Sequence, residues 1–210
     1  MKNDITYFHN LLHPYLPQGS FNLIASWIKH LPVTFDIKIS RSRSSKLGDF
    51  RPPFKTRKYP LITINKDLPS FEFFIIFIHE WAHLTVWYKY GNKVEPHGKE
   101  WKDEYTTYLS QALLAGIFPG NISSALAEHI QKPVSSVCYD EDLFKILKKY
   151  HNPGIVFLSD LPEGAHFMLN RHWTFIKGPK LRKRYKCRNL KNGRWYLVAP
   201  HAEVIPLNPT

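Results

Sequence analysis

Residues 70–90, SFEFFIIFIHEWAHLTVWYKY, decide the fold of this chain. The run FEFFIIFI at 71–78 is apolar at all but one position and more apolar residues follow it, which predicts a helix that is buried on most sides and runs through the centre of a domain. The same helix carries His79, Glu80 and His83. Because burial of such titratable groups without partners is costly, the sequence indicates a compensating partner, and a divalent cation is the simplest one.

Two histidines four residues apart lie on one face of a helix, about 5–6 Å apart at Cβ, so His79 and His83 are expected to bind one zinc ion from the same side. Glu80 lies one step further round the helix. From there its carboxylate can act as the general base that takes a proton from a zinc-bound water. The alternative is structural, with two hydrogen-bonded core histidines and Glu80 in a salt bridge.

A hydrolytic zinc site uses three protein ligands and leaves one position open, so a third ligand is expected downstream. We assign it to His97. This histidine follows Gly91-Asn92, which ends the first helix, and precedes a second helix expected over 98–115. The expected cofactor is thus one Zn²⁺ ion. Taken without its neighbours, His97 would be better interpreted as an exposed loop histidine.

The motifs HEWAH at 79–83 and HGKEW at 97–101 together resemble the SprT-like, or Spartan-type, family of zinc metalloproteases, whose pattern is His-Glu-x-x-His followed by a helix-opening His-Gly-x-x-aromatic. KLGDFR at 46–51 and ITIN at 62–65 resemble strands of the same family, and the resemblance covers residues 20–115. It implies a zincin-like core and cleavage of proteins on DNA, including covalent crosslinks. It also implies a sheet edge beside the metal helix that binds an extended substrate.

The expected fold class is α+β: a zincin-like helical core with a small sheet, then short helices and a small C-terminal β-unit. Alternating apolar residues at 35–39 and 61–64 predict two strands that share one sheet, and Ser70 or Asp67 is available to cap the long helix. Further helices are expected at 122–131 and 140–150, and strands at 166–169, 173–176, 184–190 and 194–198. The expected domains are a SprT-like metalloprotease domain at 1–118, a helical connector at 119–163 and a basic β-rich unit at 164–210.

The two cysteines, Cys138 and Cys187, are too few and too far apart for a disulfide framework, which favours a reducing cytoplasm. Both are expected to be buried thiols. SprT-like proteins often carry a zinc ribbon of paired cysteines after the protease part. Here Cys187 has no paired partner, so the sequence departs from the family pattern and predicts no second zinc. His129 and His151 are expected at the surface.

The chain of 210 residues carries 29 basic and 17 acidic residues, a net charge of +12. The excess gathers in two runs: residues 38–58 contain eight Lys or Arg and one acid, and residues 177–188 contain seven and none. A merely solubilising surface tends to mix both signs, so the runs predict a nucleic-acid footprint, with solubility as the alternative. The expected contact residues are Arg41, Arg43, Lys46, Lys180, Arg182, Lys183 and Arg184. The aromatic residues interleaved with the second run are expected either to stack on bases or to fill the core of the β-unit: Trp173, Phe175, Tyr185, Trp195 and Tyr196.

Together these features predict a zinc metalloendopeptidase that hydrolyses peptide bonds in DNA-associated or DNA-crosslinked proteins, with a protein substrate and DNA as its partners. No apolar run is long enough for a membrane span and no leader is recognisable, so a cytoplasmic protein is expected, nucleoid-associated where it binds DNA. Two alternatives stay open: a zinc- and DNA-binding chromosome-associated module with little or no proteolysis, and a hydrolase of small peptides or other amides. The sequence leaves the oligomeric state open.

Overall fold

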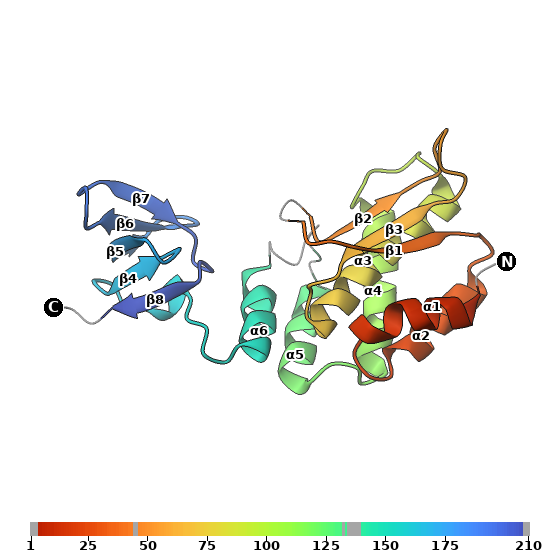
Figure 1. Cartoon of the computed structure of the whole chain (residues 1–210), viewed down its shortest axis with the longest axis horizontal. Coiled ribbons are helices and arrows are strands. Elements are labelled where there is room, and N and C mark those ends of the chain that lie inside the picture. The colour runs from red at the N-terminus through yellow and green to blue at the C-terminus, as the bar shows by residue number, and fades with distance from the viewer. Residues whose placement is uncertain (1–3, 44–45, 132, 134–139, 208–210) are drawn as a thin grey trace. The chain divides into compact units, whose positions relative to one another are not determined.

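The computed structural model of the chain describes residues 4–43, 46–131, 133 and 140–207 (Figure 1). The chain divides into two compact units, Met1–Ser135 and Ser136–Thr210, which we call unit 1 and unit 2. The segment 119–163, which the sequence suggested as a connector, is shared between them, since α5 (Gly120–His129) belongs to unit 1 and α6 (Glu141–His151) to unit 2. Both units combine helices with one small sheet, so the expected α+β class is confirmed.

The sheet of unit 1 has three strands in the order β1-β3-β2. β1 (Asp36–Ser40) is parallel to β3 (Leu61–Asn65), and β2 (Gly48–Arg51) is antiparallel to β3. The two strands expected from alternation therefore do share a sheet. β2 pairs with β3 on one side, and no other strand of the described residues pairs with its second edge, which makes it an edge strand.

The helices of unit 1 pack around a long central one. They are α1 (Ile5–Leu12), the short 3-10 helix η1 (His13–Tyr15), α2 (Ser20–His30), α3 (Ser70–Tyr90), α4 (Lys99–Leu114) and α5. α3 contacts β2, β3 and α4, and fourteen of its 21 residues are buried, so the expected central helix is confirmed. Figure 1 shows α3 and α4 side by side under the sheet.

The start of α3 differs from the expectation that Ser70 or Asp67 caps it. No side chain caps this helix, because Ser70 is already its first residue and Pro69 precedes it. The carbonyl of Pro69 accepts the N–H of Phe73 at 2.8 Å and begins the helical hydrogen bonds. At the other end, Gly91 has a φ of 65°, a left-handed value that glycine adopts without strain, and this ends the helix as predicted.

Unit 2 contains α6, the short 3-10 helix η3 (Leu158–Asp160) and an antiparallel sheet in the order β7-β6-β5-β4-β8. The strands are β4 (His166–Leu169), β5 (Trp173–Lys180), β6 (Tyr185–Asn189), β7 (Trp195–Val198) and β8 (Val204–Leu207). A cluster of apolar side chains forms the core, with Phe167, Phe175 and Cys187 among them. Burial of the Cys187 thiol is as expected, whereas Cys138 lies outside the described residues.

β8 is the one described strand of unit 2 that the sequence did not predict. It contains Pro206, which has no N–H to donate and is therefore tolerated only where one side of a strand is free. β8 pairs with β4 alone, at the edge of the sheet, which satisfies this condition. Among the residues that the structure describes, no helix is long and apolar enough to cross a membrane.

Candidate metal centre

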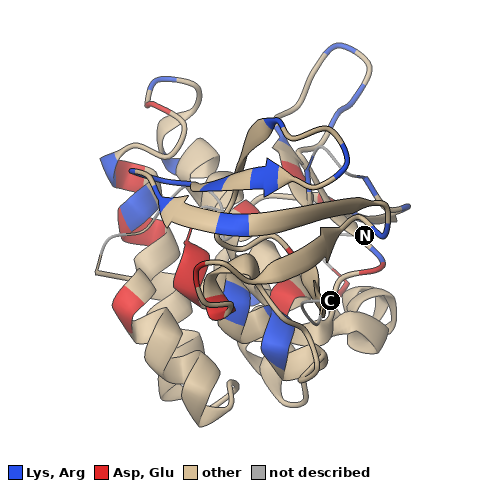
Figure 2. Ribbon diagram, turned by 90° about the vertical axis from the view of Figure 1, so that its left-hand side faces the viewer, with Lys and Arg blue, Asp and Glu red and all other residues tan. Residues whose placement is uncertain are grey.

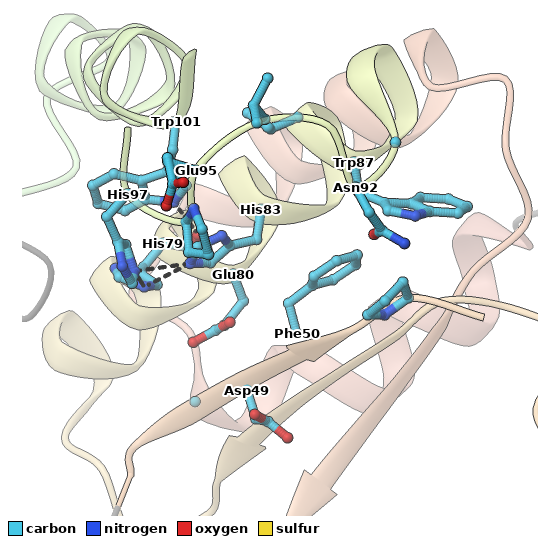
Figure 3. A pocket seen from close by; sticks show the side chains of 16 residues that line it. Asp49, Phe50, His79, Glu80, His83, Trp87, Asn92, Glu95, His97 and Trp101 are labelled. Carbon is cyan, nitrogen blue, oxygen red and sulfur yellow. Dashed lines mark hydrogen bonds between the residues drawn. The ribbon is translucent and has the colours of Figure 1, made fainter. Parts of the chain in front are cut away.

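Three histidine rings of unit 1 converge on one point. His79 and His83 lie one turn apart on α3, and His97 comes from the loop before α4. Their Nε2 atoms are 3.2 Å (His79–His83), 3.0 Å (His83–His97) and 3.2 Å (His79–His97) apart (Figure 3). Four ligands at about 2.0–2.1 Å around a tetrahedral zinc ion would lie about 3.3 Å from one another. The nitrogens therefore have the spacing that a single cation requires.

His97 reaches this position through an uncommon backbone conformation. Its φ is 60°, in the left-handed region, which costs a residue with a side chain about 1–2 kcal/mol. Gly98 then returns to an extended conformation and α4 begins at Lys99. Such strain concentrates where a side chain must point in a fixed direction, so the conformation agrees with a ligand role for His97.

Trp101, in the first turn of α4, packs against all three histidines. Its ring centroid lies 4.7 Å from those of His79 and His97 and 5.4 Å from that of His83. Its indole N–H donates to the backbone carbonyl of His79 at 3.4 Å, and only 1% of the residue is exposed. Trp101 thus shields one side of the cluster from water. The motif HGKEW contained this residue, but sequence reasoning assigned it no role.

The three rings are held in the neutral form that binds metal. Burial lowers the pKa of His79 well below its usual value, and the neighbouring rings of His83 and His97 lower it further. Burial also brings the pKa of His83 to about 3 and lowers the pKa of His97. Each ring is therefore neutral at neutral pH and offers one unprotonated nitrogen as a ligand.

Glu80 lies beside the histidines and is held by β2. Burial raises the pKa of its carboxyl group to about 8, with a smaller contribution from the charge of Asp49, while the backbone N–H of Phe50 donates a hydrogen bond to the carboxylate and opposes the rise. A Cβ atom at Gly48 would overlap Glu80 Oε1 and lie 2.7 Å from Cγ2 of Ile76. Only glycine fits there, so β2 positions the carboxylate. The glycine inside a predicted strand was the signal for this close approach.

A cavity of about 480 Å³ opens onto these groups. In Figure 3 His79, His83, His97 and Glu80 lie at one end of the drawn side chains, Trp87 and Asn92 lie at the other, and Phe50 lies between them. The rest of the lining comes from β2 and the segment after it, from α3, and from the loop between α3 and α4. The histidines and the carboxylate therefore face a space that a substrate can enter.

Some basic residues of the first run are engaged within the fold of unit 1. Arg43, expected to contact nucleic acid, donates to Asn65 Oδ1 at 2.8 Å and to Thr63 Oγ1 at 3.2 Å. Lys46 forms an ion pair of 2.7 Å with Asp49. Arg41 is exposed. Part of the first basic run thus stabilises the segment around β2.

Four basic residues at the end of β5 and between β5 and β6 of unit 2 are exposed to solvent. Lys180, Arg182, Lys183 and Arg184 are all exposed, and within the described ranges no ion pair joins any of them to an acid. Lys177 is different, because it is buried, donates to the carbonyl of Leu161 and lies over the ring of Tyr185. Figure 2 marks the Lys and Arg residues along this unit.

The aromatic residues of unit 2 divide between its core and its surface. Phe175 is buried, as expected for a core residue, and Tyr196 packs edge-on against its ring but is itself 38% exposed. On the opposite face, Arg188 pairs with Trp195 and Lys186 with Leu197 across β6 and β7. We call these four residues the outer face. The Trp195 ring is 53% exposed and lies 4.8 Å from Lys186 Nζ, so it offers a flat apolar surface among cations.

His129 is not the surface residue that the sequence suggested. It is 3% exposed, and its ring nitrogen lies 3.3 Å from the hydroxyl group of Tyr105. Tyr105 in turn stacks on Trp101, with ring centroids 4.8 Å apart. The prediction failed because α5 packs against α4, a long-range contact that helical periodicity does not reveal. His151 is exposed, as expected.

Comparisons of the chain with models of known families, with curated proteins and with solved structures found no match. A functional interpretation therefore depends on the geometry described above. The SprT-like resemblance of the two motifs stays an expectation from the sequence.

Proposed function

We propose that unit 1 is a zinc-dependent endopeptidase with a zincin-like catalytic centre. The observation that carries the proposal is the set of three Nε2 atoms 3.0–3.2 Å apart, with the carboxylate of Glu80 in the same open cavity. Two core histidines with a salt-bridged glutamate would not need a third ring in a strained conformation. They also would not need a cavity beside them.

His79, His83 and His97 would hold the cation, since all three rings are neutral and directed at one point. Three imidazoles with room for a further ligand suit zinc better than harder cations such as Mg²⁺, which prefer oxygen. When bound, the cation supplies Lewis-acid chemistry, because it acidifies water and polarises a carbonyl group.

Glu80 would move the proton. Its carboxylate takes a proton from the attacking water and returns it to the nitrogen of the leaving amine. The Phe50 N–H and the absence of a side chain at Gly48 keep this carboxylate in place between the two transfers. A positive charge bound next to it favours the ionised form and so offsets the effect of burial on its pKa.

We further propose that unit 2 holds nucleic acid, so that the substrates are proteins on DNA. The exposed cations at 180–184 and the outer face support this, since phosphates are attracted by the charge and bases stack on exposed rings such as that of Trp195. The two rival functions, a binding module without proteolysis and a hydrolase of small amides, share the metal centre and differ in what Glu80 and unit 2 do.

The test is the Glu80→Gln variant, compared with wild type in cleavage of unfolded casein and in zinc content. Cleavage is expected to fall roughly 10²- to 10⁴-fold because the proton acceptor is lost. Zinc content should not change, because Glu80 is not a ligand. Glu128→Gln, an exposed glutamate on α5, is the matched control and should behave as wild type. Wild-type protein that binds zinc but cuts no protein would favour the binding module.

A further inference from the structure

The cavity extends beyond the metal centre along α3. His79 and His83 are followed on the same helical face by Val86 and Trp87, one turn further on, and all four line the cavity. The helix therefore presents two ligands and then an apolar surface in one continuous row. A substrate bound with its scissile bond at the histidines would have its next side chain above Val86 and Trp87.

Phe50 forms the facing wall. Its ring lies almost parallel to that of His83, with centroids 6.3 Å apart and planes at 12°, and its centroid is also 6.3 Å from that of Trp87. Phe50 and Trp87 are half-buried, so each keeps apolar surface exposed to the cavity. Figure 3 shows Trp87 and Asn92 at the end of the cavity away from His79 and His97, with Phe50 between this end and Glu80.

The charged side chains that line the cavity are few, and all of them are acidic. Its described lining includes Asp49, Glu80 and Glu95 but neither Lys nor Arg. Asp49 is paired with Lys46 and Arg51, and Glu95 is exposed on the loop. Apart from the proposed cation at the three histidines, no charged side chain of this lining would therefore neutralise an acidic substrate side chain.

We infer that this end of the cavity is a specificity subsite for a large apolar side chain, which packs on the surface that Phe50 and Trp87 form together next to the scissile bond. The inference rests on the proposed peptidase function and adds its side-chain preference. Burial of a phenylalanine side chain there favours binding over alanine by roughly 10- to 100-fold. The rival interpretation is that Glu95 selects a basic side chain.

The test measures binding without chemistry. Zinc-loaded Glu80→Gln protein is titrated with short fluorescein-labelled peptides that differ at one central position, Phe, Ala, Lys or Asp, and binding is followed by fluorescence anisotropy. The Phe peptide should bind roughly 10- to 100-fold more tightly than the Ala peptide, and the Asp peptide most weakly. Equal affinity for Phe and Ala, or tighter binding of Lys than of Phe, overturns the inference.

Two further variants in the Glu80→Gln background locate the subsite. Trp87→Ala should remove most of the preference for Phe, while Tyr88→Ala, the next residue on α3 and 45% exposed outside this cavity, should keep it. Val94→Glu, on the loop side, should shift the preference from Phe towards Lys, which keeps the test decisive if Trp87→Ala fails to fold. An unchanged preference in folded Trp87→Ala protein or in Val94→Glu protein overturns the assignment.

Cleavage assays with zinc-loaded wild-type protein distinguish a failure of the proposed subsite from a failure of the proposed peptidase function. Cleavage sites in casein are mapped by mass spectrometry. Sites without a common apolar neighbour would leave the peptidase proposal intact and overturn the subsite. Selective binding of the Phe peptide by Glu80→Gln, with no cleavage by wild type, would overturn the peptidase proposal and support the subsite.

Discussion

The proposed metal centre of unit 1 and the outer face of unit 2 hold their functional side chains in opposite ways. Glu80 is 5% exposed and is fixed by Gly48 and the Phe50 N–H, whereas the Trp195 ring is 53% exposed and stands among cations. A centre that moves protons needs fixed distances, and burial provides them. A surface that attracts a polyanion needs charge and accessible rings, and exposure provides these.

The same contrast separates two basic runs of similar composition. In unit 1, Arg43 and Lys46 are bound to neighbouring side chains and stabilise the segment that carries β2. In unit 2, Arg182, Lys183 and Arg184 are exposed. Composition alone therefore does not identify a nucleic-acid surface, because cations that are already paired contribute less to the field at the surface.

The largest effect is expected from two glycines, one in each unit. Gly48→Ala should lower proteolysis about 100-fold or more, because the new Cβ atom overlaps the Glu80 carboxylate and misplaces it. Zinc content should stay at the wild-type value, since the three histidines are untouched. The measurements are casein cleavage and elemental analysis.

Gly178→Ala is the counterpart in unit 2. Its Cβ atom would overlap the backbone carbonyl of Lys186 and lie 3.5 Å from the ring of Trp195. We expect unit 2 to be destabilised by about 1–3 kcal/mol and DNA binding to weaken, with casein cleavage unchanged. Loss of casein cleavage in this variant, or its retention in Gly48→Ala, would contradict the assignment of proteolysis to unit 1 and DNA binding to unit 2.

Charge-reversal variants test which of the two basic runs, 38–58 or 177–188, contacts DNA. The triple variant Arg182→Glu, Lys183→Glu, Arg184→Glu should weaken binding of single-stranded DNA roughly 10- to 100-fold and lower the salt dependence of that binding, because about three phosphate contacts are lost. Binding is measured by anisotropy between 50 and 200 mM salt. The matched control, Lys46→Glu, removes a cation already paired with Asp49 and should change affinity far less.

Replacement of one exposed ring tests stacking on the outer face. Trp195→Ala should cost about 1–2 kcal/mol of DNA binding free energy, a smaller effect than charge reversal, and should leave the salt dependence unchanged. Phosphate contacts set that dependence, and none is removed. The control is Trp173→Ala, which removes a ring of similar exposure (47%) on β5. Equal losses in both variants would mean that the outer face is not a specific stacking site.

The smallest expected effect is a pH-dependent change in the stability of unit 1. Partial burial alone would raise the pKa of Asp49, but hydrogen bonds and ion pairs with Lys46 and Arg51 outweigh it, so the pKa lies below its usual value of 3.8. The stabilisation is therefore present above pH 3.8 and is lost as the pH falls through the folded-state pKa. Because these pairs are partly exposed, Asp49→Asn should cost less than about 1 kcal/mol at pH 7 and less at pH 2 than at pH 7. Thermal unfolding at both pH values measures this.

Much of unit 1 could be predicted because its signals are local. The run of apolar residues before His79 predicted the central helix, and Gly91 its end. The ligand spacing of His79 and His83 follows from helical geometry alone. His97 required the neighbouring motif, since a loop residue has no periodicity to place it.

The remainder depends on contacts between segments distant in the sequence. The burial of His129 against Tyr105 and the position of Gly48 under Glu80 both arise from packing between elements. In unit 2, the β-pattern predicted β4, β6, β7 and the first half of β5, but it did not separate the inward Phe175 from the outward Trp195. That separation depends on which face of the sheet meets the core, and a single sequence does not fix it.

The central claim is that His79, His83 and His97 bind one zinc ion together. The most direct measurement is elemental analysis of protein purified without added metal, for wild type, His97→Ala and the control His13→Ala, an exposed histidine of unit 1. We expect one zinc per chain in wild type and His13→Ala and close to none in His97→Ala. A full zinc content in His97→Ala, or a wild-type protein that binds no zinc even when it is supplied, would contradict the central claim.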